Sequence, residues 1–218
     1  MSYKLFSHRG LLIGNSKLKE NTIKAFQNSI DNHFKAIEVD IWYYQNELIL
    51  HHDQPIKKID NYDKLSDLFK EFGNKIEYWL DLKNLKQKNA TTALNKLKLL
   101  IDKNKIDYDK ILFVPCLKKT NLKQNEFAYK EVRNIFGKDC NLAAFTTNIN
   151  KNNLQKYYHQ LKDYNINKLS IKFSNIDEEF IKIFYDIEIF AWTVDNKKTL
   201  DYLTKLNIKN FATNILTY

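Results

Sequence analysis

Cysteine is scarce in this chain, which has only Cys116 and Cys140 among its 218 residues. Two thiols this far apart have neither the close spacing of a zinc site nor the density of a disulfide framework. They are interpreted as small apolar residues in a reducing cytosol. No segment reaches the roughly 20 apolar residues that a membrane-spanning helix needs, and the opening MSYKLFSHRG lacks a signal-peptide pattern. We therefore expect a soluble cytoplasmic protein without stable membrane insertion.

The length permits one substantial hydrophobic core and is short for two domains, so we expect a single domain over residues 1–218. Lysine and arginine number 35 against 26 acidic residues, which gives a formal net charge of +9. This excess attracts anions in general. The basic residues are spread along the chain, and no RNA-binding motif is present, so nucleic acid is not an expected partner.

Short apolar runs alternate with segments that have the apolar spacing of amphipathic helices. The expected strands are Tyr3–Ser7, Ala36–Ile41, Tyr78–Leu82, Ile111–Cys116, Leu142–Thr146, Lys168–Phe173, Glu188–Val194 and Asn210–Ile215. Helical spacing occurs within residues 65–72, 94–101, 128–136, 154–161 and 176–184. Strand–helix alternation implies parallel strands with right-handed crossovers. Eight such units favour an α/β fold of the (β/α)₈ TIM-barrel type, with an open doubly wound sheet as the alternative.

Two features depart from a regular barrel. The extra apolar run Glu47–His52 follows the second strand and is expected to form a short hairpin arm. The sequence also leaves no room for a helix after the last strand. We expect this to leave an apolar groove between the first and last strands, where a second copy could bind to form a homodimer.

Polar side chains gather where the early strands end, the place where the loops of a parallel barrel carry functional residues. They are Ser7-His8-Arg9-Gly10, Glu38 and Asp40, His51-His52-Asp53, and Asp81 with Lys83. Strand alternation places Glu38 and Asp40 on one face and apolar residues on the other, so the carboxylates are expected to point into the barrel mouth. The same alternation points Asp81 and Lys83 inward.

Three inward carboxylates form an all-oxygen cluster, the ligand set of Mg²⁺ or Ca²⁺ rather than of zinc. Taken alone, the paired carboxylates are also typical of a salt-bridged layer, and a histidine at a strand end is also typical of an ordinary loop residue. Their joint occurrence at consecutive strand ends favours a catalytic site.

Taken in order, these residues resemble the pattern of the glycerophosphodiester phosphodiesterase family. The matching segments are His8-Arg9-Gly10, Glu20-Asn21-Thr22, Glu38-x-Asp40, His52-Asp53, Asp81-x-Lys83, Trp192-Thr193-Val194-Asp195 and Thr213-Asn214. The resemblance covers almost the whole chain. It implies a TIM barrel of the phospholipase C-like phosphodiesterase superfamily, acting in lipid and glycerol metabolism on a small phosphodiester and releasing an alcohol and glycerol 3-phosphate.

The resemblance also implies a role for individual residues. His8 and His52 would be the acid–base pair, with His52 rather than His51 because the family histidine directly precedes an aspartate. One divalent metal ion, Mg²⁺ or Ca²⁺, would be held by Glu38, Asp40 and Asp81. Arg9 and Lys83 would bind phosphate oxygens, and Trp192 would line the pocket that receives the alcohol group.

Three departures from the family pattern bear on the substrate. Asp81 replaces the usual glutamate and is more like the sphingomyelinase D enzymes. Thr213-Asn214 stands where the family has Thr-Asp, and the segment between His52 and Asp81 is short, which predicts a more open pocket. The alternatives are therefore a lysophospholipase D-like enzyme, an enzyme acting on glycerol-phosphate units of surface polymers, and a protein that binds phosphate polymers without cleaving them.

Overall fold

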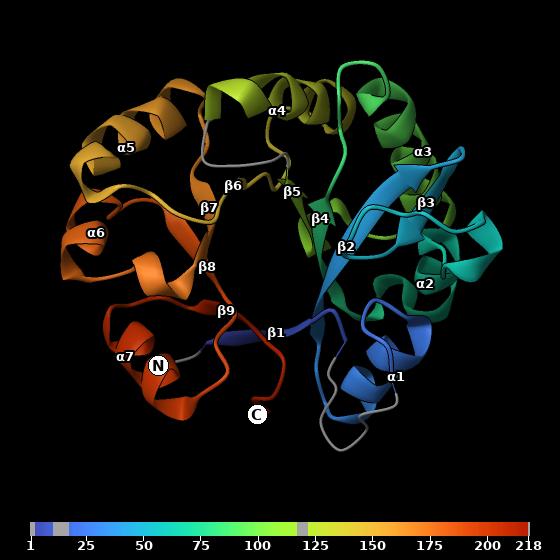
Figure 1. Ribbon diagram of the computed structural model, residues 1–218, viewed down its shortest axis with the longest axis horizontal. Helices are drawn as coiled ribbons and strands as arrows, with labels where there is room; N and C mark the ends of the chain where they lie inside the picture. Colours follow the sequence, from blue (N-terminus) through green and yellow to red (C-terminus); the bar gives the residue numbers. More distant parts are fainter. Residues whose placement is uncertain (1–2, 11–17, 117–121, 218) are drawn as a thin grey trace.

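The computed structural model describes residues 3–10, 18–116 and 122–217, in which strands and helices alternate around a ring (Figure 1). The parallel strands are β1 (Lys4–His8), β2 (Ala36–Tyr44), β4 (Glu77–Leu82), β5 (Ile111–Pro115), β6 (Ala144–Thr146), β7 (Lys168–Lys172), β8 (Glu188–Trp192) and β9 (Asn210–Thr213). The helices around them are α1 (Ile23–Asp31), α2 (Leu65–Phe72), α3 (Ala90–Lys103), α4 (Leu122–Phe136), α5 (Leu154–Asp163), α6 (Glu178–Ile183) and α7 (Lys197–Lys205).

The sheet closes on itself. The strands are paired in the order β5-β4-β2-β1-β9-β8-β7-β6, which leaves one seam between β5 and β6. At this seam the Phe113 N–H donates to the Asn141 carbonyl at 2.8 Å, and the Ala143 N–H donates to the Phe113 carbonyl at 3.0 Å. The predicted (β/α)₈ barrel is therefore confirmed, and the alternative of an open doubly wound sheet is wrong.

Three aromatic rings fill the inside of the barrel. Phe6, Trp79 and Phe190 come from β1, β4 and β8, which are not neighbours in the sheet. Their ring centroids nevertheless lie 5.4–6.0 Å apart, so the rings meet across the interior. Because side chains alternate along a strand, the intervening residues face outward and form the larger core beneath the helices.

The hairpin arm is confirmed, with different ends from those expected. β2 continues to Tyr44 and pairs in antiparallel register with β3 (Glu47–Leu50). Gln45 and Asn46 join the two strands with φ values of 47° and 61°. Positive φ at both central residues is the geometry of a tight hairpin turn whose twist matches that of the strands.

The prediction of an open apolar groove between the first and last strands is wrong. Leu5 of β1 and Phe211 of β9 point outward there, and both are fully buried. No helix follows β9 in the described residues, but the Tyr3 ring packs edge-on against Phe211 at this place, with 6.2 Å between the ring centroids. The argument for a homodimer contact at this groove therefore does not hold.

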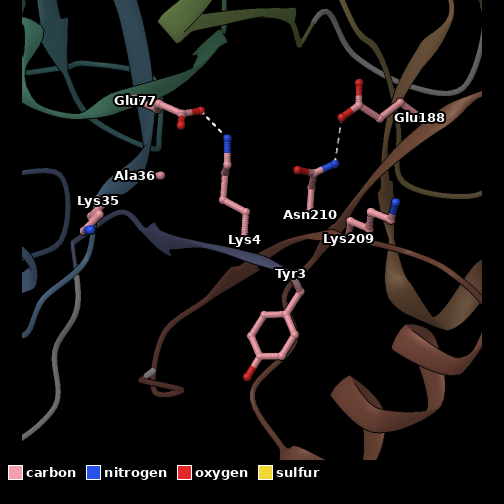
Figure 2. Close-up of a pocket in the computed structure, with 8 residues that line it drawn as sticks. All are labelled: Tyr3, Lys4, Lys35, Ala36, Glu77, Glu188, Lys209 and Asn210. Carbon is pink, nitrogen blue, oxygen red and sulfur yellow. Dashed lines mark hydrogen bonds and ion pairs between the residues drawn. The ribbon is translucent and has the colours of Figure 1, made fainter. Parts of the chain in front are cut away.

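Charged side chains cover the amino end of the barrel (Figure 2). Lys4 Nζ lies 2.5 Å from a Glu77 carboxylate oxygen, while Glu188 accepts from Asn210 at 2.9 Å and pairs with Lys168 at 2.7 Å. These groups are partly exposed, so each pair contributes at most about 1 kcal/mol to stability. Lys4, Glu77, Glu188 and Asn210 are among the residues that line a shallow pocket of 360 Å³.

Among the described residues, every helix is too short or too polar to cross a lipid bilayer.

Trp79→Ala is expected to lower the free energy of unfolding by about 3–5 kcal/mol, because it empties the middle of the barrel where the rings of Phe6 and Phe190 meet. Urea unfolding followed by circular dichroism measures this loss. Tyr185→Ala, at a side chain that is 76% exposed, is the control and should change stability by less than about 0.5 kcal/mol. Equal losses in the two variants would contradict the packing described here.

Candidate active site

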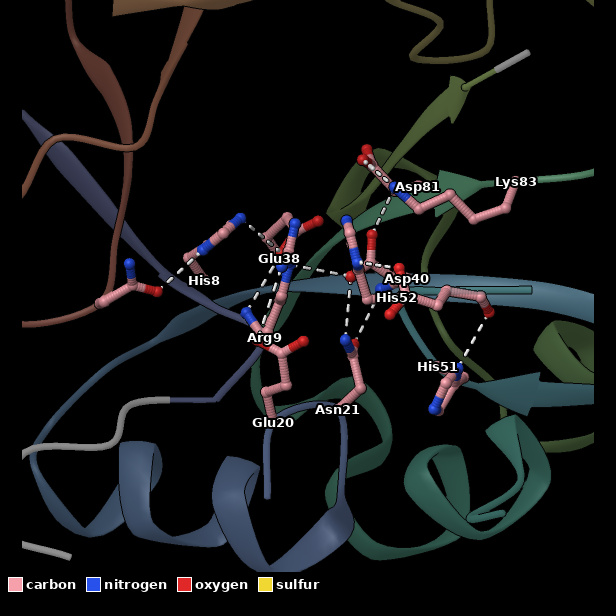
Figure 3. Close-up of polar contacts among 12 residues, drawn as sticks. His8, Arg9, Glu20, Asn21, Glu38, Asp40, His51, His52, Asp81 and Lys83 are labelled. Atoms are coloured by element: carbon pink, nitrogen blue, oxygen red, sulfur yellow. Dashed lines mark hydrogen bonds and ion pairs between the residues drawn. The ribbon is translucent and has the colours of Figure 1, made fainter. Parts of the chain in front are cut away.

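Strand register brings the predicted acidic residues together at the carboxyl end of the barrel (Figure 3). His8 of β1 pairs with Glu38 of β2, and Asp40 of β2 pairs with Asp81 of β4. One oxygen from each of Glu38, Asp40 and Asp81 lies within 4.8 Å of the others. The three residues are 2%, 0% and 6% exposed. They form the carboxylate cluster that strand alternation predicts.

Two cations lie against this cluster. Lys83 Nζ is 2.5 Å from one Asp40 oxygen and 3.1 Å from Asp81, and Arg9 Nε is 3.0 Å from the other Asp40 oxygen. The predicted phosphate-binding residues thus lie at the cluster, where they contact its carboxylates. Three acidic and two basic groups leave one negative charge unbalanced when all are ionised.

Glu38 is the carboxyl group of the cluster whose side chain forms no ion pair with Lys83 or Arg9 among the described contacts. Burial, followed by the charges of Asp40 and Asp81, raises the pKa of Glu38 well above its usual range. Burial opposes ionisation of Asp40 as well, but Lys83 and Arg9 outweigh it and lower the pKa of that carboxyl. Lys83 and Arg9 therefore favour the ionised form of Asp40, and a further cation at the cluster would favour the ionised form of Glu38.

The donor set fits a hard divalent cation. It consists of carboxylate oxygens from three buried residues with surplus negative charge, which suits Mg²⁺ or Ca²⁺. Asp81 is fixed in orientation because Trp79 Nε1 donates to one of its oxygens at 2.9 Å and Lys83 to the other at 3.1 Å.

Asn21 holds Asp40 in place, a function that the sequence left unassigned within its Glu-Asn-Thr segment. Its side-chain amide donates to an Asp40 oxygen at 2.9 Å, and its side-chain carbonyl accepts from the Asp40 backbone N–H at 3.0 Å. Thr22 caps helix α1 by accepting from the Ala25 N–H, and Glu20 lies 3.5 Å from Arg9. The segment therefore starts the helix and orients a carboxylate at the same time.

Gly10 allows helix α1 to approach the site. Its φ is 88°, and a Cβ atom built there would lie 2.5 Å from the Ala25 Cβ. Any other residue would push the helix away from β1. This close approach explains the glycine after His8-Arg9.

His8 is oriented by a chain of hydrogen bonds from Asp195. One Asp195 oxygen accepts from the Asn214 side-chain amide at 2.9 Å, which turns the Asn214 carbonyl oxygen toward His8 Nδ1 at 2.8 Å. An amide oxygen can only accept, so Nδ1 carries the proton and Nε2 of the neutral ring is free. That Nε2 lies 3.8 Å from Glu38. Burial and then Arg9 lower the pKa of His8, which keeps the ring neutral at pH 7.

His52 follows the hairpin arm, and in the view of Figure 3 it is drawn at Asp40, with Glu38 between it and His8. Its side chain is 39% exposed, and its Nδ1 lies 2.9 Å from an Asp53 carboxylate oxygen. His51 is turned elsewhere, with Nδ1 bonded to the Asp53 carbonyl at 2.9 Å and its ring edge-on to Tyr62. The two neighbouring histidines lie beyond the end of β3 and have different surroundings.

The loop that carries His52 is closed at its base by Asp63. The Leu50 N–H donates to the Asp63 carbonyl at 2.8 Å, and the Asp63 carboxylate accepts from the Ile23 N–H at the start of helix α1 at 2.7 Å. The two ends of the loop formed by residues 51–62 therefore lie next to each other.

Trp192 lies at the end of β8, apart from the hydrogen bonds of the cluster. Its ring stacks on Phe145 with 5.6 Å between centroids and an angle of 4° between planes, and Nε1 donates to Ser170 at 3.0 Å. Its predicted place in the pocket wall stays a prediction.

Two pockets open near the cluster. The first, of 470 Å³, is lined by His52, Asn21 and the closed loop. The second, of 660 Å³, is lined by Lys83 and by the segment leading into α3. Neither pocket could be outlined from the sequence, because each joins loops that are distant along the chain.

No family model and no curated protein matches the sequence, whereas the fold matches several solved structures. A glycerophosphodiester phosphodiesterase from Parabacteroides distasonis has a TM-score of 0.75 at 13% identity, covering 98% of this chain and 94% of that one. The enzyme of that name from Thermotoga maritima has a TM-score of 0.71 at 16% identity, covering 98% and 95%.

A phosphodiesterase from Oleispira antarctica, solved with the product sn-glycerol-3-phosphate, has a TM-score of 0.73 at 11% identity and covers 97% of this chain and 92% of that one. At these identities the likeness establishes the fold. The chain is thus a TIM barrel of the form seen in glycerophosphodiester phosphodiesterases.

Mg²⁺ or Ca²⁺ is expected to raise the melting temperature, because a ligand that binds the folded state stabilises it. Glu38→Gln should abolish this increase, since it removes one ligand and the charge surplus of the cluster. Thermal unfolding with and without each ion measures the effect. Glu71→Gln, at an exposed glutamate at the end of α2, is the control. An undiminished increase in the Glu38 variant would refute the metal site.

Asn214→Asp is expected to raise the pKa of His8 by about one unit or more, because a carboxylate next to Nδ1 favours the protonated ring. NMR titration of the histidines measures the shift. Asn207→Asp, at an exposed residue before β9, adds the same charge at the amino end of the barrel and should leave His8 unchanged. A constant or lowered pKa in the Asn214 variant would contradict the proposed orientation of the ring.

Proposed function

We propose that this protein is a metal-dependent phosphoric diester hydrolase that cleaves glycerophosphodiesters into an alcohol and glycerol 3-phosphate. One observation carries the proposal. A buried cluster of three carboxyl groups lies beside His8, at the mouth of a barrel of the glycerophosphodiester phosphodiesterase form. Product-bound sn-glycerol-3-phosphate in the Oleispira antarctica structure supports the choice of substrate.

The charges of the site suit a phosphodiester, which is an anion that gains charge on its non-bridging oxygens during attack. A divalent cation held by Glu38, Asp40 and Asp81 supplies Lewis-acid stabilisation of those oxygens. Arg9 and Lys83 lie against the same carboxylates and add positive charge where the phosphate would bind. In a site with little water these interactions together are worth several kcal/mol of transition-state stabilisation.

The two histidines suit opposite proton transfers. His8 is neutral with a free Nε2, so it accepts the proton of the attacking oxygen as the new P–O bond forms. His52, whose Nδ1 lies 2.9 Å from an Asp53 carboxylate oxygen, donates a proton to the alcohol oxygen as the old P–O bond breaks. The attacking oxygen belongs to water or to a neighbouring hydroxyl of the substrate.

A second candidate is a lysophospholipase D-like or sphingomyelinase D-like activity. It is favoured by Asp81, whose short carboxylate is typical of those enzymes, and by the open pockets beside the cluster. Incubating the protein with glycerophosphocholine and with lysophosphatidylcholine, in EDTA, Mg²⁺ or Ca²⁺, separates the two by product. Hydrolysis of neither diester, combined with binding of phosphate polymers, would support a non-catalytic binding protein instead.

His8→Ala and His52→Ala are each expected to lower the rate of glycerol 3-phosphate release at least about 100-fold, because each removes one proton transfer. Circular dichroism should show an unchanged fold. His51→Ala is the matched control, since that ring bonds to the Asp53 carbonyl and contacts Tyr62, and it should retain activity within a few-fold. Full activity in either His8 or His52 variant would refute the assignment.

A further inference from the structure

Lys83 bridges two of the three carboxylates of the cluster (Figure 3). Its ammonium lies 2.5 Å from Asp40 Oδ1 and 3.1 Å from Asp81 Oδ2. The Lys83 backbone N–H donates to the Ile41 carbonyl at 2.9 Å, so the backbone of the residue is anchored on β2 next to Asp40. A single cation on a flexible side chain therefore joins acids from two neighbouring strands.

The remaining oxygens of these two aspartates are held by other donors. Asp40 Oδ2 accepts from the Asn21 amide at 2.9 Å and lies 3.0 Å from Arg9 Nε. Asp81 Oδ1 accepts from the Trp79 indole N–H at 2.9 Å. These donors fix the orientation of both carboxylates. The oxygens that the two aspartates can share with one cation are therefore the two that the lysine ammonium contacts.

A divalent cation and the Lys83 ammonium compete for these two oxygens. Mg²⁺ binds carboxylate oxygens at about 2.0–2.1 Å and Ca²⁺ at about 2.3–2.6 Å. An ammonium and a metal ion on the same pair of oxygens would lie a few ångströms apart, where like charges repel strongly. Asp40 and Asp81 are both buried, so water screens this repulsion little.

The Lys83 side chain borders open space on its other side. It lines the 660 Å³ pocket beside the cluster, and none of the described residues lining that pocket carries a carboxylate. An ammonium that turns from the aspartates toward this pocket finds no counter-ion in its lining. A phosphate oxygen is then the anion that can pair with it.

We propose that Lys83 competes with the divalent metal for Asp40 and Asp81, and that its ammonium pairs with phosphate once it has given up these two carboxylates. This competition rests on the metal site of the proposed function and assigns how metal and phosphate binding are coupled there. Each ligand strengthens the binding of the other, because both favour the same position of one side chain.

The first experiment titrates Mg²⁺ or Ca²⁺ into protein freed of metal with EDTA, using calorimetry. Lys83→Gln should bind the ion at least about tenfold more tightly than wild type, because the competing cation is gone. Arg9→Gln is the matched control. It removes the same charge from the other oxygen of Asp40, and the ion pairs of Arg9 among the described residues are with Asp40 and Glu20.

The Arg9 variant should gain at most about threefold in affinity. Equal gains in the two variants would reflect net charge alone and would overturn the inference. Unchanged or weaker binding by Lys83→Gln would overturn it as well. Metal binding by none of the proteins would refute the metal site and the inference together.

The second experiment uses wild type alone, so it stands even where Lys83→Gln does not fold. A brief pulse of acetic anhydride labels accessible amines, and peptide mass spectrometry follows Lys83 and Lys86. Mg²⁺ should raise the labelling rate of Lys83 at least about threefold, because the amine leaves two carboxylates that hold it protonated. The exposed Lys86 should keep its rate. A constant or lower rate at Lys83 contradicts its displacement.

The third experiment measures the coupling with sn-glycerol 3-phosphate as the probe. Mg²⁺ should raise the affinity of wild type for this probe at least about fivefold, and the factor should be at least about threefold smaller in Lys83→Gln. The same factor in both proteins overturns the coupling through Lys83. The expected results in all three experiments, without hydrolysis of any diester, uphold the inference and refute only the proposed hydrolysis.

Discussion

Burial of Asp40 is the constraint on which the rest of the site depends. A fully buried carboxylate costs several kcal/mol unless charges and hydrogen bonds compensate it. Asp40 receives this compensation from three separate segments: Arg9 after β1, Asn21 before α1, and Lys83 after β4. Each contact fixes one loop at the barrel mouth. The residues that balance this charge therefore also tie the segments after β1 and β4 to the segment before α1.

The interior of the barrel is coupled to its chemistry through Trp79. Its ring meets Phe6 and Phe190 in the middle of the barrel, and its indole N–H holds the Asp81 carboxylate. Trp79 thus contacts both the apolar interior of the barrel and the polar site at its carboxyl end. At the other end of the barrel, partly exposed ion pairs such as Lys4–Glu77 cover the strand starts without a comparable cluster of buried acids among the described residues.

The sequence was sufficient to predict features that depend on local periodicity. Strand–helix alternation predicted the barrel, and alternation within β2 placed Glu38 and Asp40 on one face. Features that depend on contacts between distant segments were missed. The Asp195–Asn214–His8 hydrogen bonds join the two ends of the chain, and Tyr3 packs against Phe211 where an open groove was expected. The sequence shows that residue 214 is asparagine where the family pattern has aspartate. Only the structure shows that its side chain contacts His8, a predicted catalytic residue.

The closed loop of residues 51–62 has a consequence for how such a site can diversify. Its ends are joined by the Leu50–Asp63 hydrogen bond, and Asp63 also anchors helix α1. Because the base is fixed, added residues within the loop would cost little closure entropy and would not displace the strands. If the proposed function holds, selectivity for the leaving group can therefore evolve by lengthening this one loop, while the carboxyl groups of the cluster keep their positions on the barrel strands.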